Sequence, residues 1–267
     1  MFHVKRCAGD MGKTIIICNQ KGGTGKTTTS VNLSAALADL GKKILLVDMD
    51  PQGNATSGVG VNKNEIKNSA YEVLLSKAQA SKSIVKTAVT NLELIPCNIH
   101  LTGAEIELVG VLSRESKLKK ALQEVKDSYD YIILDSPPSL GLLTLNSLVA
   151  ADSIIIPIQC EFYALEGVSQ LLNTITLVRD NLNPGIQIEG VLLTMADFRT
   201  KLTVEVINEI RNYFKEKVYQ SIIPRNIRLS EAPSHGKPIN IYDSFSIGAK
   251  KYAALALEVI AAQAKIT

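Results

Sequence analysis

The fold is decided by residues 13–28, which read Lys13-Thr14-Ile15-Ile16-Ile17-Cys18-Asn19-Gln20-Lys21-Gly22-Gly23-Thr24-Gly25-Lys26-Thr27-Thr28. The three consecutive isoleucines predict a strand over Lys13–Asn19 that is buried on both faces. A helix is expected over Lys26–Leu40, and Gly41 stands where a glycine commonly ends a helix. A glycine-rich turn therefore joins a buried strand directly to a helix.

This turn is typical of a phosphate-binding loop. Glycines let successive backbone N–H groups converge on phosphate oxygens, and the helix N-terminus adds its positive end. In such loops the lysine (here Lys26) reaches the β- and γ-phosphates, and the next hydroxyl (Thr27) holds Mg²⁺. Gln20 replaces the first glycine of the usual G-x-x-x-x-G-K-[ST] pattern, and Lys21 stands beside it. We predict that nucleotide is bound by Lys21, Gly22, Gly23, Thr24, Gly25, Lys26, Thr27 and Thr28.

Two acidic motifs complete the predicted site. Asp48 and Asp50 are two residues apart at the end of a strand expected over Lys43–Asp48, so both carboxylates point the same way. A second apolar strand, Tyr131–Leu134, is followed by Asp135, a position suited to an Mg²⁺-binding carboxylate. Ligands of open α/β sheets lie beyond the carboxyl ends of the strands, so all three motifs should meet there. Taken singly, each carboxylate could instead be a capping or turn residue.

Short apolar runs alternate with helical patterns along the rest of the chain. Further strands are expected at Leu92–Ile95, Ser153–Ile156, Ile186–Leu193 and Tyr219–Ile223, and helices within Thr102–Lys126 and at Leu165–Leu182, Leu202–Lys217 and Ile247–Ala264. Buried strands that alternate with helices require parallel crossovers. The expected fold is a doubly wound α/β sheet, mostly parallel, with helices on both faces. The polar segment Gly53–Ala88 is expected to be a surface excursion with a short helix.

The composition indicates a soluble, globular protein. Hydrophobic residues make up 46% of the chain and charged residues 21%, and no apolar run is long enough to cross a membrane. The four cysteines, Cys7, Cys18, Cys97 and Cys160, form no Cys-x-x-Cys pair. This spacing argues against a disulfide framework and a zinc site, and favours a reducing cytosol. We therefore expect a cytoplasmic protein without stable membrane association.

No linker or internal repeat divides the chain, so a single domain is expected over residues 13–267. Residues 1–12 precede the pattern that forms the sheet, and Met11 would itself serve as a start. We expect these residues to be a disordered extension, with a functional basic arm through Lys5, Arg6 and Lys13 as the alternative.

Five segments resemble the deviant Walker A ATPases and, within that superfamily, the ParA/Soj branch of DNA-partitioning ATPases. They are Asn19–Asn32, Leu46–Gly58, Asp135–Ser139, Pro157–Gly167 and Ile223–Pro238, and the resemblance runs along nearly the whole chain. The resemblance implies a slow, Mg²⁺-dependent ATP hydrolase of the P-loop class that segregates chromosomes or plasmids. It also places Pro224 and Asn226 against the adenine.

The resemblance assigns further roles to the loop lysines and the carboxylates. It implies an ATP-bound sandwich homodimer in which Lys21 crosses to the partner's nucleotide. From the residues alone, Lys21 either serves a second phosphate or is a solvated loop lysine. The resemblance makes Lys21, Lys26 and Asp50 catalytic, with Asp50 orienting the attacking water. It assigns Asp135 to Mg²⁺ through water, with Asp48 nearby.

The positive charge of the chain is concentrated near its C-terminus. Between Met195 and Lys251 there are ten basic and six acidic residues, a balance of +4 in a chain whose net charge is +3. Aromatic residues are only 5% of the chain, so we expect any DNA binding to involve the backbone and to be independent of sequence. In the ParA branch, arginines matching Arg199, Arg225 and Arg228 contact DNA. The alternative is a solvated basic face.

The resemblance implies partners as well as a location. ParA-type proteins associate with non-specific double-stranded DNA in the nucleoid, and a DNA-bound, ParB-type centromere-binding protein stimulates their hydrolysis. The cargo that such a system would move, whether a chromosome, a plasmid or another complex, is left open by the sequence.

Other functions on the same scaffold are less well supported. A MinD-like ATPase that positions a membrane-associated or other large cargo would need a basic amphipathic C-terminal helix, whereas Tyr252–Thr267 is rich in alanine. A nitrogenase-type reductase would need cluster-bridging cysteines in a suitable motif. A GTPase is disfavoured because Glu65 replaces the aspartate of a guanine-reading motif in Asn62-Lys63-Asn64-Glu65. A kinase or amide synthetase would need an acceptor pocket that the sequence does not display.

Overall fold

The structure is a computed structural model that describes residues 12–161 and 164–264. Its strands are β1 (Lys13–Ile17), β2 (Ile44–Asp48), β3 (Val85–Lys86), β4 (Leu92–Ile95), β5 (Tyr131–Asp135), β6 (Ser153–Gln159), β7 (Gln187–Ala196) and β8 (Val218–Pro224). They form one sheet in the order β3-β4-β2-β5-β1-β6-β7-β8. Among the strands in the described residues, only β3 pairs antiparallel to its neighbour, so the predicted mostly parallel sheet is confirmed.

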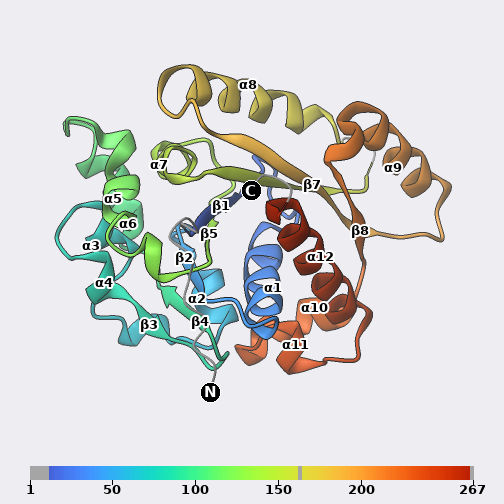
Figure 1. Cartoon of the computed structure of the whole chain (residues 1–267), viewed down its shortest axis with the longest axis horizontal. Helices are drawn as coiled ribbons and strands as arrows, with labels where there is room; N and C mark the ends of the chain where they lie inside the picture. Colours follow the sequence, from blue (N-terminus) through green and yellow to red (C-terminus); the bar gives the residue numbers. More distant parts are fainter. Residues whose placement is uncertain (1–11, 162–163, 265–267) are drawn as a thin grey trace.

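Helices cover both faces of this sheet (Figure 1). They are α1 (Lys26–Asp39), α2 (Asn54–Gly58), α3 (Ala70–Leu74), α4 (Ala80–Ser83), α5 (Leu101–Glu107), α6 (Lys117–Leu122), α7 (Leu142–Ala150), α8 (Glu166–Asn181), α9 (Lys201–Phe214), α10 (Ile227–Glu231), α11 (Ile239–Tyr242) and α12 (Ile247–Ala264). Short 3-10 turns lie at η1 (Lys63–Glu65), η2 (Arg114–Ser116), η3 (Lys126–Ser128), η4 (Lys215–Lys217) and η5 (Ala232–His235). The doubly wound α/β architecture is thereby confirmed.

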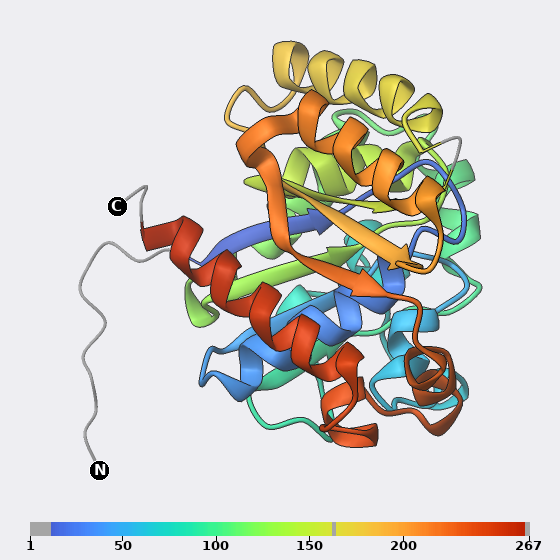
Figure 2. The same ribbon diagram turned by 90° about the vertical axis from the view of Figure 1, so that its right-hand side faces the viewer.

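The isoleucine run of β1 serves two separate cores. Ile15 and Ile17 pack with α1 and α12 on one face, whereas Ile16 and Cys18 pack on the opposite face with the helices from α3 to α9. Successive side chains of a strand point to opposite faces, so a central strand covered on both sides must be apolar throughout. Figure 2 shows α12 and α1 on one side of the sheet and α8 and α9 on the other.

Several parts of the chain differ from the sequence prediction, among them the short helices α10 and α11, which were not predicted. The segment 53–88 holds three short helices and the edge strand β3, and Ala70, Val73 and Leu74 of α3 are buried in the core. The region 102–126 contains two short helices, α5 and α6, in place of one. The helix α7 was not predicted, because it is buried on nearly all sides and so has no polar face to mark its period.

The predicted extension falls almost wholly outside the described residues. Gly12 is its one described member, and a Cβ there would lie 2.4 Å from the carbonyl oxygens of Lys126 and Tyr129. Within residues 12–161 and 164–264, no helix is long and apolar enough to span a bilayer.

Candidate functional site

The glycine-rich loop links the carboxyl end of β1 to α1, near the point where the strand order reverses. Gly23 and Gly25 adopt left-handed φ values of +74° and +87°, a backbone conformation that favours glycine. The Oγ1 of Thr194, on β7, donates a hydrogen bond of 2.9 Å to the carbonyl oxygen of Thr24. This buried contact fixes the loop against the sheet.

Lys26 is the buried cation of the site. The residue is only 7% exposed, and its Nζ donates to the carbonyl oxygen of Lys21 at 2.9 Å. Burial lowers the pKa of Lys26, and the charges of Asp135 and Asp50 oppose that shift. The ammonium group is therefore stabilised by the charges of Asp135 and Asp50, and the Lys26 side chain crosses the loop to reach Lys21.

Asp135 ends β5 and is fully buried. It accepts hydrogen bonds from two hydroxyl groups of α1, Thr27 Oγ1 at 2.9 Å and Ser30 Oγ at 2.8 Å. Burial and the charge of Asp48 raise the pKa of Asp135 to about 8. Buried carboxylates this close together favour a nearby cation, because a positive charge stabilises their ionised forms.

Thr27 and Asp135 fit Mg²⁺ through the chemistry of their donor atoms. A hydroxyl and a carboxylate are hard oxygen ligands, and Mg²⁺ usually keeps waters and substrate phosphates as its other ligands. The described residues contain no group of three His, Cys, Asp or Glu side chains arranged to hold a metal ion. A metal here would therefore depend on phosphate and water for most of its coordination.

Asp48 and Asp50 have different surroundings. Asp48 is fully buried, and its Oδ2 accepts hydrogen bonds from the backbone nitrogen and Oγ1 of Thr56 at 2.8 and 2.7 Å. Burial raises the pKa of Asp48 to about 6. Asp50 accepts the Gln52 N–H through Oδ1 at 2.9 Å, while its Oδ2 accepts no hydrogen bond within the described part of the chain. Asp48 thus anchors α2, and Asp50 keeps one oxygen available for a ligand.

Lys21 forms an ion pair with Glu161, just beyond β6 in the same chain. The two side chains are 39% and 38% exposed, so water screens the pair and its contribution to stability is small. Lys21 can therefore leave Glu161 for a phosphate at little cost.

A cavity of ≈ 480 Å³ lies between the phosphate loop and the carboxyl ends of β7 and β8. Gly25 and Thr28 line it from the loop side, and Pro224 and Asn226 line it from the side of β8. Asn226 also caps α10, because its Oδ1 accepts the N–H of Arg228 at 2.8 Å. The structure thus brings the predicted adenine residues against the predicted phosphate loop, around a space of the size that small-molecule ligands occupy.

The three predicted DNA-contacting arginines gather at the same end of β7 and β8. Arg199 donates two hydrogen bonds to Asp197, at 2.8 Å from Nε and 2.6 Å from Nη2, which lower the pKa of Asp197 to about 2. The charge of Arg225 acts on the same carboxylate. Arg228, on α10, pairs with Glu231 at 3.0 Å. All three arginines are exposed, and two of them are already paired with carboxylates.

Four residues of the site were not foreseen from the sequence. Ser30 could have been found, because it lies three residues after Thr27 and therefore on the same face of the helix. Thr56, Thr194 and Glu161 are each brought to the site by contacts between distant segments. No local pattern marks such residues.

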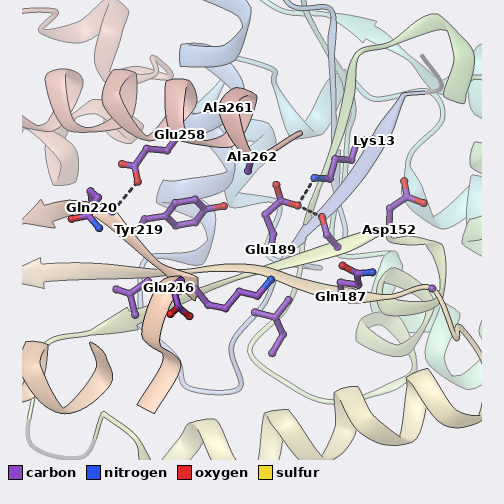
Figure 3. Close-up of a pocket in the computed structure, with 15 residues that line it drawn as sticks. Lys13, Asp152, Gln187, Glu189, Glu216, Tyr219, Gln220, Glu258, Ala261 and Ala262 are labelled. Carbon is purple, nitrogen blue, oxygen red and sulfur yellow. Dashed lines mark hydrogen bonds and ion pairs between the residues drawn. The ribbon is translucent and has the colours of Figure 1, made fainter. Parts of the chain in front are cut away.

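A second hollow lies at the amino-terminal end of the strands, away from the loop (Figure 3). Lys13 and Glu189 form an ion pair of 2.6 Å there, and Ser153 Oγ donates to Glu189 at 2.5 Å. None of the predicted site residues lines it. Ligands of open α/β sheets bind beyond the carboxyl ends of the strands, so the candidate site is the edge that carries the phosphate loop.

Comparisons with known proteins place this site in context. A family model described as an AAA domain matches residues 12–188. The sporulation initiation inhibitor protein Soj of Bacillus subtilis is 61% identical over 251 residues, which cover 94% of this chain and 99% of that protein. The chromosome partitioning protein ParA of Myxococcus xanthus is 52% identical over 250 residues, covering 94% and 88% of the two chains.

Solved structures share the fold along nearly the whole chain. Cobyrinic acid a,c-diamide synthase of Mycobacterium smegmatis, with bound ADP and magnesium, is 36% identical with a TM-score of 0.85, covering 96% of this chain and 97% of that one. The cell division ATPase MinD of Pyrococcus furiosus is 27% identical with a TM-score of 0.75, covering 94% and 99%.

Proposed function

Because this chain belongs to the Soj/ParA family of chromosome-partitioning ATPases, we propose that it is an ATP-dependent DNA-segregation ATPase. ATP binding would drive formation of a sandwich dimer that binds DNA without sequence preference. Slow hydrolysis, stimulated by a ParB-type partner, would release the DNA. The observation that carries this proposal is the meeting of the phosphate loop, three buried carboxylates and the cavity lined by Pro224 and Asn226 at one edge of the sheet.

The residues of the loop suit phosphoryl transfer from ATP to water. Such reactions are catalysed mainly by positioning and by neutralising charge on the phosphates. Lys26 would neutralise the β- and γ-phosphates, and the free Oδ2 of Asp50 would orient the attacking water. Mg²⁺, held by Thr27 and through water by Asp135, would supply further positive charge when bound. Asp48 would act by holding α2, and with it the Asp50 loop, in place.

Lys21 would link the nucleotide state to dimerisation. Lys26 already serves the protomer's own phosphates, so the half-exposed Lys21 is available to a second nucleotide once it leaves Glu161. We expect Lys21→Ala to bind ATP as a monomer but to lose the ATP-dependent dimer in sedimentation experiments. A normal ATP-dependent dimer of this variant would refute the role of Lys21.

The arginines at the ends of β7 and β8 would form the DNA surface. Each phosphate that they neutralise contributes about −0.9 to the log–log dependence of affinity on salt. We expect the pair Arg199→Ala and Arg228→Ala to abolish gel shifts of non-specific duplex DNA while the ATP dimer persists. Arg179→Ala, which removes an exposed charge from α8, is the matched control. Unchanged gel shifts of the double variant at moderate salt would contradict this assignment.

A MinD-like membrane role is less well supported than DNA segregation. Tyr252, Leu255, Ala256 and Val259 of the C-terminal helix α12 are buried against the sheet and α1, so this apolar face is not available to lipid. The identities of 61% and 52% to Soj and ParA also exceed the 27% identity to MinD of Pyrococcus furiosus. We therefore favour a nucleoid-associated protein over one on the membrane.

The decisive experiment measures ATP hydrolysis alone, with non-specific DNA, and with DNA plus the candidate ParB-type protein. We expect slow basal turnover that rises only when both DNA and the partner are present. Asp50→Ala should remove the stimulated rate in the same assay. A rate of ATP hydrolysis that changes neither with DNA nor with the ParB-type protein would refute the proposed function.

A further inference from the structure

We infer that a backbone contact between Gly60 and Gly236 couples the Asp48–Asp50 loop to the proposed DNA surface around Arg228. This inference rests on the proposed function. Gly60 follows α2, and Gly236 ends η5, which continues directly from α10. Their φ values are +85° and +62°. A Cβ on Gly60 would lie 2.9 Å from the carbonyl oxygen of Gly236, and one on Gly236 would lie 3.1 Å from Cα of Gly60. The two backbones therefore touch where no side chain fits.

On one side of the contact, α2 is tied to the catalytic carboxylates. The helix begins four residues after Asp50, and Thr56 binds Asp48 through both its backbone nitrogen and its hydroxyl group. The carbonyl oxygen of Ser57 accepts the N–H of Gly60 at 3.0 Å. A change in the position of the Asp48–Asp50 loop would therefore move Gly60 with α2.

On the other side, the contact leads to Arg228. Glu231, where α10 meets η5, accepts hydrogen bonds from Arg228 Nη1 at 3.0 Å and from the hydroxyl of Tyr242 at 3.2 Å. The ring of Tyr242 stacks on His235 with the ring centroids 5.0 Å apart. The direction of the Arg228 side chain thus depends on where η5 lies.

The helix α1 provides a second tie to the same segment. Asn32 Oδ1 accepts the N–H of Ile239 at 2.7 Å in a buried hydrogen bond, and Asn32 Nδ2 donates to the carbonyl oxygen of Thr28 at 2.7 Å. Residues 236–239 therefore contact both α1, which begins at the phosphate loop, and the end of α2, which follows the Asp48–Asp50 loop. The segment η5 packs against α2, and α11 packs against α1 (Figure 1).

This arrangement makes Gly60 and Gly236 positioning residues for DNA binding. A nucleotide that shifts α1 or α2 would shift η5 and α10, and DNA bound at Arg228 would favour the same position of α2. Coupling of this kind is reciprocal, and it changes affinity by about 5- to 150-fold in typical proteins. The contact would supply the physical link, because close-packed backbones transmit small displacements.

The test compares Gly60→Ala and Gly236→Ala with Gly41→Ala. Gly41 has a similar φ of +79°, but nothing lies within 4 Å of its Cβ position, so its variant carries the backbone strain without the clash. Affinity for a non-specific duplex is measured by fluorescence anisotropy with ATP and with ADP. We expect the ATP-to-ADP affinity ratio to be at least about tenfold in the wild type and in Gly41→Ala, and to fall to about twofold in the two contact variants.

Two further measurements separate coupling from folding. Binding of a fluorescent ATP analogue should be retained by both contact variants. Hydrogen exchange of residues 237–243 should slow on adding the analogue in the wild type but not in Gly236→Ala, the variant with the milder clash. If that segment is already unprotected without nucleotide in both variants, the contact is merely structural and the coupling is overturned.

The outcomes distinguish the inference from the function on which it rests. A wild-type protein without ATP-dependent DNA binding would contradict the proposed function itself. If DNA affinity depends on ATP in the wild type and equally in both contact variants, only the coupling through Gly60 and Gly236 is overturned. Loss of the dependence in Gly41→Ala as well would attribute the effect to backbone strain and would also overturn the coupling.

Discussion

Replacing Thr56 by valine should destabilise the fold around the buried Asp48. The Thr56 hydroxyl donates to Asp48 at 2.7 Å and accepts the N–H of Cys97 at 2.9 Å, and Thr56 and Asp48 are fully buried. Losing a hydrogen bond to a charged group costs about 1.5–3 kcal/mol, and an unsatisfied buried N–H costs about 1–3 kcal/mol. The valine methyl group offsets about 0.8 kcal/mol through burial.

We therefore expect Thr56→Val to lower the free energy of unfolding by about 3 kcal/mol, which corresponds to a decrease in Tm of about 6–10 °C for a chain of this size. Urea unfolding and calorimetry of the nucleotide-free protein measure both quantities. Thr56→Ser keeps the hydroxyl and loses one methyl group, so it should cost only about 1 kcal/mol. Equal stabilities of the two variants would refute the anchoring role of the hydroxyl.

The effect of Thr56→Val on the free energy of unfolding should depend on pH. The folded pKa of Asp48, about 6, lies above its ordinary value of 3.8, so ionisation of Asp48 lowers stability as the pH rises from about 4 to about 6. The Thr56 hydrogen bond favours the ionised form and limits that loss. The difference in the free energy of unfolding between wild type and Thr56→Val should therefore be largest above pH 6 and decrease as the pH falls. A difference that grows on acidification would contradict this assignment.

Three other substitutions test the remaining contacts of the site. Glu161→Gln removes the carboxylate that holds Lys21, so sedimentation should detect the ATP-dependent dimer at lower protein concentration; an unchanged dimerisation constant would show that the pair has no influence. Thr194→Val removes the hydroxyl that binds the Thr24 carbonyl, and we expect about 3- to 10-fold weaker binding of a fluorescent ATP analogue, with Thr194→Ser close to wild type. Asp50→Ala should form a dimer that persists because hydrolysis stops, and turnover near the wild-type rate would contradict the role of Asp50.

The sequence predicted the parts of the site that have a local pattern. The run Ile15–Ile17 indicated a doubly buried strand, the glycines after it indicated the loop, and Asp48 and Asp135 were found because each ends an apolar strand. The structure places these elements at one edge of the sheet, as predicted. Their chemical roles stay predictions, which the substitutions above test.

The contacts between distant segments could not be predicted in this way. Thr194 reaches the loop across 170 residues, and Glu161 reaches Lys21 across 140. Such contacts depend on the spatial order of the strands in the sheet, and no local sequence pattern indicates that order. The helix α7 was missed for a related reason, since burial on nearly all sides removes the polar stripe by which a surface helix is recognised.

The pairing of the arginines with carboxylates has a consequence for which anions this surface can hold. Arg199 is engaged by Asp197, and Arg228 by Glu231 with Asp243 3.5 Å away. An incoming phosphate must therefore replace a carboxylate at each arginine, and a single phosphate gains little by the exchange. A polymer that presents several phosphates at fixed spacing makes all the exchanges in one binding event, so its gains add together. We therefore expect this surface to bind polyanions in preference to free nucleotide and inorganic phosphate.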